Sequence, residues 1–144
     1  MTLWLLLHYQ IPAHPTAQRV YIWRKLKRLG AILLYGAVWV LPATARTREQ
    51  FQWLASEIAE LGGEAMLWEA RLTPANQDSS LIRQFTVQVE REYQKIASEL
   101  NRRKPDLAGL SRKYQQVQMT DYFQSPFGVR VREALMSARN GATR

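Results

Sequence analysis

The sequence predicts an α+β protein in which a ferredoxin-like βαββαβ unit, with an antiparallel four-stranded sheet, precedes a helical region. Three observations lead to this class. Residues 3–10 form a near-continuous apolar run, which is typical of a strand covered on both faces. Two segments of helical periodicity then alternate with short apolar runs up to residue 72. From residue 73 onward only helical periodicity is found.

The first helix is expected over residues 16–29. Pro12 and Pro15 force a loop after the first strand, and Pro15 suits the first turn of a helix. On a helical wheel, one apolar face contains Ile22, Trp23, Leu26 and Leu29. Arg19 falls on the core side of the first turn. It must therefore either extend its charge to solvent or point at a group near the end of the first strand.

A hairpin and a second helix follow. Two apolar runs, residues 31–35 and 37–41, are separated by Gly36 and predict a hairpin or a bend. Thr47 and Gln50 have the spacing of a capping box at the start of a helix. This helix is expected to bury four apolar residues before Gly62-Gly63 ends it: Phe51, Leu54, Ile58 and Leu61.

The fourth strand is expected over residues 64–72, where apolar residues alternate. The right-handed crossover rule places the first strand in the centre of the sheet and both helices on one face. The other face then needs a cover. Trp4, Trp39 and Trp68 are expected to supply apolar surface there, for a partner subunit or for the C-terminal helices.

Residues 73–144 are expected to form a helical extension that packs on residues 1–72, giving one compact domain overall. A helix of about 25 residues is predicted by an apolar stripe: Leu81, Phe85, Val89, Tyr93, Ile96 and Leu100. A second stripe, from Leu107 to Val117, completes an antiparallel helical hairpin. After an aromatic-rich loop over residues 121–128, a short final helix is expected over residues 129–138, with residues 140–144 frayed.

The net charge of +8 is unevenly distributed. Residues 1–42 contain five Lys or Arg and no Asp or Glu, which suggests an anionic partner such as nucleic acid. Three groups are candidate phosphate contacts: Arg24, Lys25 and Arg28 beside Tyr21; Arg102, Arg103 and Lys104 at the hairpin tip; and Arg112 with Lys113 about one turn beyond it. Each group is also compatible with a solvated surface. No recognition-helix or zinc-finger pattern indicates how bases would be read.

The composition argues against several classes of protein. Because the chain has no cysteine, disulfides, cysteine nucleophiles and thiolate metal sites are excluded, and a reducing compartment is expected. The opening Met-Thr-Leu-Trp lacks the basic start of a signal peptide. The longest apolar stretch, residues 29–42, is shorter than the roughly 18 residues that a membrane span needs. We therefore expect a cytoplasmic protein without a membrane partner.

No catalytic, metal or cofactor site is predicted. The two histidines, His8 and His14, have no carboxylate nearby in the sequence. No pair of acids is grouped with a nucleophile, and no glycine-rich phosphate-binding motif occurs. The expected protein is therefore not an enzyme and uses no cofactor.

The N-terminal region carries a first resemblance. Tyr9-Gln10-Ile11-Pro12, Arg19, residues 25–30 and residues 37–40 resemble the small CRISPR-associated ferredoxin-like nucleases, which are dimers. The proposed metal-binding aspartate of those nucleases ends the first strand, where this chain has His8, Tyr9 and Gln10. The resemblance thus implies the fold rather than the cleavage chemistry, and a degenerate nuclease is one alternative.

A closer resemblance is carried by segments spread over residues 3–138. In order they are Trp4-Leu5-Leu6-Leu7, Gln10-Ile11-Pro12-Ala13, Arg19-Val20, Trp23-Arg24-Lys25-Leu26, Leu29-Gly30-Ala31, Val40-Leu41-Pro42, Trp53-Leu54-Ala55, Glu57-Ile58, Gly62-Gly63-Glu64-Ala65, and Asp121-Tyr122-Phe123 with Pro126. Together they resemble the N-terminal domain of the chromate-resistance regulator ChrB. This resemblance implies a cytoplasmic regulator that binds operator DNA, and a second, C-terminal domain in full-length members.

The leading hypothesis is therefore a non-enzymatic transcriptional regulator, a homodimer that binds DNA through its first helix and its hairpin tip. Arg19 is a candidate for binding chromate or another oxyanion, because a guanidinium offers paired donors to such oxygens. The main alternative is a protein-interaction module in which the tryptophans and the helical hairpin form the interface.

Overall fold

The computed structural model describes residues 2–142 and confirms the predicted α+β class. The chain divides into two compact units with a boundary between Ser79 and Ser80. The first unit contains β1 (Trp4–Gln10), α1 (Thr16–Arg28), β2 (Ile32–Leu34), β3 (Val38–Pro42), α2 (Ala45–Glu60) and β4 (Glu64–Ala70). α3 (Ala75–Leu100) begins in the first unit and continues into the second, which also contains α4 (Leu107–Met119) and α5 (Pro126–Ala142). The packing of the helical region on the sheet unit stays a prediction.

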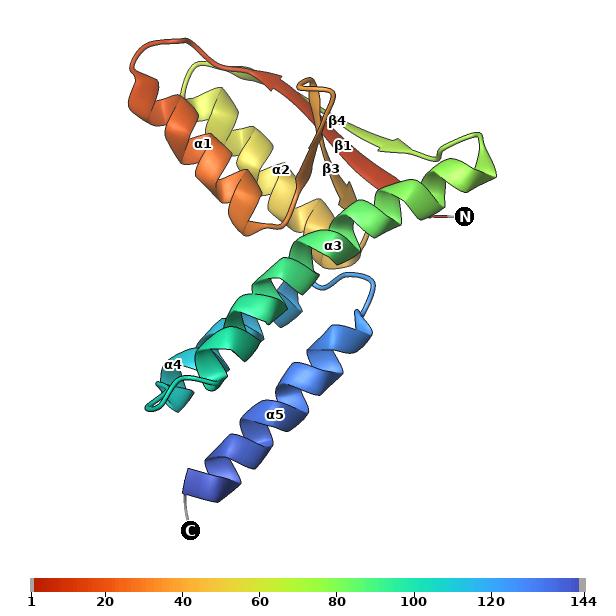
Figure 1. Cartoon of the computed structure of the whole chain (residues 1–144). Helices are drawn as coiled ribbons and strands as arrows, with labels where there is room; N and C mark the ends of the chain where they lie inside the picture. Colours follow the sequence, from red (N-terminus) through yellow and green to blue (C-terminus); the bar gives the residue numbers. More distant parts are fainter. Residues whose placement is uncertain (1, 143–144) are drawn as a thin grey trace. The chain divides into compact units, whose positions relative to one another are not determined.

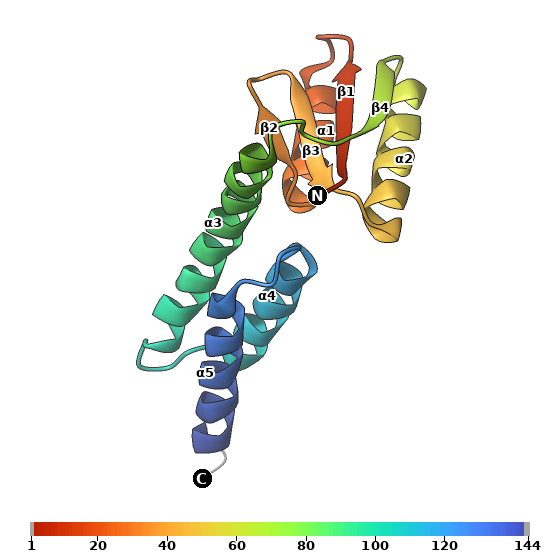
Figure 2. The same ribbon diagram turned by 90° about the vertical axis from the view of Figure 1, so that its right-hand side faces the viewer.

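β1 occupies the centre of the sheet, as the crossover rule predicts. The strand order is β2-β3-β1-β4, and all neighbours are antiparallel. β1 pairs with β4 over its whole length, from Trp4 opposite Ala70 to Gln10 opposite Glu64. Figures 1 and 2 show α1 and α2 on the same face of this sheet. The first unit thus has the predicted ferredoxin-like βαββαβ arrangement.

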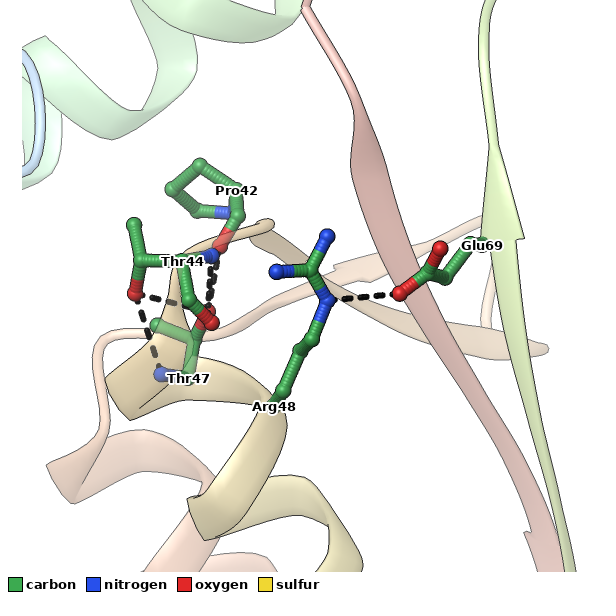
Figure 3. A network of polar contacts seen from close by, with 5 residues as sticks. All are labelled: Pro42, Thr44, Thr47, Arg48 and Glu69. Carbon is green, nitrogen blue, oxygen red and sulfur yellow. Dashed lines mark hydrogen bonds and ion pairs between the residues drawn. The ribbon is translucent and has the colours of Figure 1, made fainter.

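The strand register assigns each side chain of the sheet to one face. Residues that lie opposite each other on neighbouring strands point to the same side. Leu7 therefore shares a face with Trp39. In the same way Leu5 shares this face with Glu69 of β4. Because Arg48 Nε of α2 lies 2.6 Å from Glu69 Oε1 (Figure 3), this is the face that the two helices cover.

Trp39 consequently belongs to the helix-covered face, where it is buried. The prediction that it lies with Trp4 and Trp68 on the other face is wrong. Trp4 and Trp68 do share that other face, since Trp68 lies opposite Leu6. Neighbouring residues of a strand point to opposite faces, so the face of Trp39 depends on the residue opposite it. That residue is Leu7, which points toward the helices.

The start of α2 differs from the sequence prediction by one turn. The helix begins at Ala45, and its capping box is formed by Thr44 and Thr47 rather than by Thr47 and Gln50. The Thr47 amide donates to Thr44 Oγ1 over 3.0 Å, and the Thr44 amide donates to Thr47 Oγ1 over 2.8 Å. The Thr47 hydroxyl also donates to the Pro42 carbonyl over 2.7 Å, which ties α2 to the end of β3 (Figure 3).

α1 buries a narrower stripe than the sequence predicts. Ile22 and Leu26 are fully buried, whereas Leu29 is only half-buried. Trp23 is 49% exposed, which contradicts its predicted place in the core. It lies at the edge of the stripe, where the Lys27 ammonium is 5.7 Å from the centre of its ring.

A buried carboxylate connects the start of β1 to the start of α3. Asp78 Oδ1 accepts a hydrogen bond of 2.9 Å from Trp4 Nε1, and Asp78 Oδ2 accepts one of 3.1 Å from the Thr2 amide. Both bonds favour the charged form, so they lower the pKa of Asp78, the Trp4 bond having the larger effect.

The second unit is a bundle of α3, α4 and α5. The predicted apolar stripes meet in one core, which consists of Val89, Tyr93, Ile96, Leu110, Val131 and Leu135. The α3–α4 hairpin is confirmed, but α5 is longer than the expected helix over residues 129–138. It begins at Pro126 because Ser125 Oγ accepts from the Phe127 amide, and it continues to Ala142. The predicted fraying is therefore wrong for residues 140–142, and its remaining part, residues 143–144, lies outside the described part of the chain.

Tyr93 joins this core to the loop before α5. It is fully buried, and its hydroxyl donates to Asp121 Oδ2 over 2.8 Å. Burial, and then the bond to Asp121, raise the pKa of Tyr93 well above its usual value. Gly128 in the first turn of α5 packs directly on this ring, because a Cβ there would lie 2.8 Å from Tyr93 Oη.

Replacing Gly128 with alanine is therefore expected to destabilise the second unit. The buried Tyr93 ring has no room to move away, so the free energy of unfolding should fall by about 1–3 kcal/mol in urea denaturation. Gly141→Ala is the matched control in the same helix, since a Cβ there meets nothing within 4 Å. It should be neutral or stabilising by up to about 1 kcal/mol. A Gly128→Ala variant as stable as the control would contradict the packing.

Candidate nucleic-acid interface

The outer face of α1 carries the first predicted group of basic residues. The helix contains no acidic residue, and Arg24 and Arg28 lie one turn apart on it, both exposed. With Lys25 they line an open hollow of about 510 Å³, whose other wall residues are Thr16, Ala17, Val20 and Tyr21. The sequence placed these three cations on one surface, and the structure brings them together.

Lys25 is nevertheless engaged within the protein. Its Nζ lies 2.7 Å from Glu57 Oε1 of α2, and the Tyr21 hydroxyl donates to Glu57 Oε2 over 2.8 Å. The Lys25 ammonium also lies 4.9 Å from the centre of the Tyr21 ring. The bond to Glu57 raises the pKa of Lys25, and the bond to Lys25 lowers the pKa of Glu57. Much of the Lys25 charge is therefore compensated.

Arg24 and Arg28 differ from Lys25 in this respect. Within residues 2–142 neither arginine takes part in an ion pair. Two exposed guanidinium groups one turn apart offer several N–H donors to an anion outside the protein. The first group thus consists of two available cations and one that mainly joins α1 to α2.

A smaller pocket of about 200 Å³ lies between α1 and α2. It shares Lys25 and Arg28 with the open hollow and is completed by Leu29, Gln50, Trp53, Leu54 and Glu57. Gln50 Oε1 is buried, and within residues 2–142 it has no hydrogen-bond partner. Trp53 is 63% exposed. This pocket was not predicted from the sequence. The one indication of it in the sequence is Trp53, which lies outside the apolar stripe that Phe51, Leu54 and Ile58 form on α2.

The other predicted basic groups lie in the second unit. Arg102, Arg103 and Lys104 are exposed in the turn between α3 and α4, as expected. Arg112 is exposed on α4, whereas Lys113 Nζ lies 3.7 Å from Glu99 Oε1.

Two basic residues of the second unit were missed. Arg132 and Arg139 of α5 line an open hollow of about 510 Å³ with side chains of α4, among them Ser111, Gln115 and Gln118. The sequence signal was present, because a spacing of seven residues repeats the same helix face. It was overlooked because the expected final helix ended at residue 138.

Arg19 stands apart from these groups. It is exposed, so its predicted place on the core side of α1 is wrong; the buried stripe begins only at Ile22. Its exposure agrees with the first alternative for Arg19, a charge that extends to solvent. Burial raises the pKa of Tyr9, and the nearby positive charge of Arg19 opposes this rise.

Across residues 2–142 no three His, Asp or Glu side chains gather closely enough to hold a metal ion. Over the same residues no helix combines the length and the apolar character that a membrane crossing requires.

The first unit is therefore a ferredoxin-like α+β domain with a basic helix face. The family model described as "Protein ChrB, N-terminal" matches residues 19–120. The chain belongs to this family, which confirms the resemblance and supports a link to chromate resistance. No curated protein and no solved structure matches the chain.

The Lys25–Glu57 pair leads to a pH-dependent prediction. The pKa of Glu57 is lowered, so the stabilisation is present above its ordinary value of 4.5 and is lost as the pH falls through the lowered pKa. The pKa of Lys25 is raised, so the stabilisation is also present below 10.5 and is lost as the pH rises through the raised pKa. Glu57→Gln should therefore lower the free energy of unfolding at pH 7 by less than about 1 kcal/mol, because the pair is partly exposed.

The measurement is urea denaturation of wild type and variant as a function of pH. The difference should be constant at neutral pH and should vanish in acid. Glu60→Gln serves as the control, since Glu60 is exposed on the same helix and forms no ion pair within the described part of the chain. A Glu57→Gln effect that persists in acid would show that packing, rather than charge, stabilises this contact.

Proposed function

We propose that this protein is a non-enzymatic transcriptional regulator related to chromate resistance, which binds DNA through α1. The observation that carries the proposal is the pair Arg24 and Arg28, exposed beside one open hollow on a helix without acidic residues. Phosphate groups require several Lys or Arg on one surface, and this helix provides them. Family membership supplies the link to chromate resistance.

The remaining basic groups extend the same proposal. Arg102, Arg103, Lys104 and Arg112 are exposed cations that would add phosphate contacts. Lys113 would contribute less, because Glu99 partly compensates its charge. We propose a homodimer, in which two α1 faces would contact two half-sites of a symmetric operator.

Neutralising the two available arginines should weaken the salt dependence of DNA binding. In Arg24→Gln/Arg28→Gln, the slope of log affinity against log salt concentration should become shallower by about 1.8, since each phosphate contact contributes about 0.9. The measurement is fluorescence anisotropy of a labelled duplex at several salt concentrations.

Arg83→Gln/Arg91→Gln is the matched control, because it removes two exposed charges of α3 that belong to none of the candidate groups. Its slope should stay close to that of the wild type. An unchanged slope in the α1 variant, or an equal change in both variants, would exclude this face as the phosphate-binding surface.

The regulatory part of the proposal predicts selective binding that responds to chromate. A fragment from upstream of the protein's own gene should be bound more tightly than a scrambled fragment, and chromate should weaken this binding. Arg19→Gln should bind the fragment normally but lose the chromate response, because the paired N–H donors for the oxyanion are removed. Equal affinity for both fragments would leave only a general affinity for polyanions.

One observation favours the protein-interaction alternative. Met66 and Trp68 are 54% and 49% exposed, and they point to the face of β4 opposite to α2. An oligomer that resists high salt, in a protein that binds neither fragment, would support this alternative.

A further inference from the structure

The pocket between α1 and α2 has features that phosphate binding does not use. Its walls come from one stripe of each helix: Lys25 and Arg28 of α1 with Leu29 directly after it, and Gln50, Trp53, Leu54 and Glu57 of α2. Leu54 is buried and gives the pocket an apolar surface. The volume of about 200 Å³ lies below the range of about 300–1,000 Å³ found for sites of drug-sized ligands, so a single flat ring system is a suitable occupant.

Gln50 provides an acceptor without a donor. Its Oε1 is withdrawn from solvent, yet no group of the described chain donates a hydrogen bond to it. Buried polar atoms are nearly always hydrogen-bonded, because leaving one unpaired is unfavourable. A ligand with an N–H group directed at Gln50 would satisfy this oxygen.

Trp53 provides a stacking surface at the rim of the same pocket. Its side chain is 63% exposed although tryptophan is usually largely buried. Exposed aromatic rings beside cationic side chains are the usual platforms for unpaired bases, because every base has a π-face.

The charge of the pocket selects the type of ligand. Lys25 and Glu57 are joined at 2.7 Å, so they largely compensate each other and leave Arg28 as the uncompensated charge. Arg28 also lines the open hollow with Arg24. An anionic group is therefore favoured at the α1 side, next to a flat ring on Trp53.

We propose that this pocket binds one unpaired nucleobase. The ring stacks on Trp53, an exocyclic amino group of the base donates to Gln50 Oε1, and the attached phosphate lies on Arg28. The inference rests on the proposed function and deepens it, because Arg28 belongs to the same phosphate-binding face. The base belongs either to a nucleic-acid strand or to a free nucleotide, and both sources present the same chemistry.

The test compares three probes with wild type and variants. The probes are a labelled duplex, the same duplex with one extrahelical adenine, and AMP, whose binding is followed by NMR of the tryptophan indole N–H groups. Trp53→Ala should lower the affinity for the adenine-bulged duplex or for AMP by about 5- to 100-fold, while the intact duplex is unaffected. Trp53→Phe should retain most of the affinity, because a phenyl ring still stacks.

Gln50 is tested through the base itself. Wild type should prefer adenine over unsubstituted purine, which lacks the amino group, by about 2- to 10-fold, and Gln50→Leu should lose this preference. Gln50→Leu should fold at least as stably as the wild type, since it removes an unpaired buried acceptor. The matched controls are Trp23→Ala, which removes an exposed tryptophan of α1, and Gln52→Leu, which changes an exposed glutamine of α2.

The outcomes separate the two proposals. If Arg24 and Arg28 govern duplex binding but Trp53→Ala behaves like Trp23→Ala with every probe, the base pocket is excluded and the proposed function stands. If only AMP binds, and Trp53→Ala abolishes this, the pocket is supported with a free nucleotide and the DNA-binding proposal fails. Absence of binding to all three probes overturns both.

Discussion

The central position of β1 is the constraint on which the first unit depends. β1 is hydrogen-bonded to β3 on one edge and to β4 on the other, so both helical connections must cross the same side of the sheet. α1 and α2 are thereby placed next to each other, and side chains of both helices form the pocket. The open hollow, in contrast, is lined by α1 alone. The pocket thus depends on the topology of the sheet, whereas the hollow depends on the sequence of one helix.

The cations of α1 differ in whether they have a partner within the protein. Lys25 is held by Glu57 and Tyr21, and this small cluster joins the two helices. Arg24 and Arg28, on the same helix face, form no ion pair within residues 2–142. A count of charges treats the three residues alike. Glu57 on the neighbouring helix distinguishes them, because it pairs with Lys25 and with neither arginine. The net charge therefore overstates how much of this face is available to an anion.

Local patterns predicted the elements well, because apolar periodicity reports burial directly. The register of the sheet was harder to predict, and Trp39 was assigned to the wrong face. Strand pairing decides which residues of a strand face the helices, and the sequence of a single strand does not contain that information. Thr44 was missed as the cap of α2 because Thr47 and Gln50 gave a plausible alternative one turn later. The pocket could not be predicted, because Gln50 and Arg28 meet only after two helices pack. Position in the fold, rather than residue type, gives these side chains their roles.

Arg28 lines both the open hollow and the pocket, so the two proposed ligands would share one guanidinium. One guanidinium adopts one orientation at a time, so a ligand that draws it toward the pocket would change the affinity of the hollow for its own ligand. By reciprocity, the free energy of this coupling is the same in both directions. Lys25, which is joined to Glu57, lines both sites as well, so two side chains of α1 would carry this coupling.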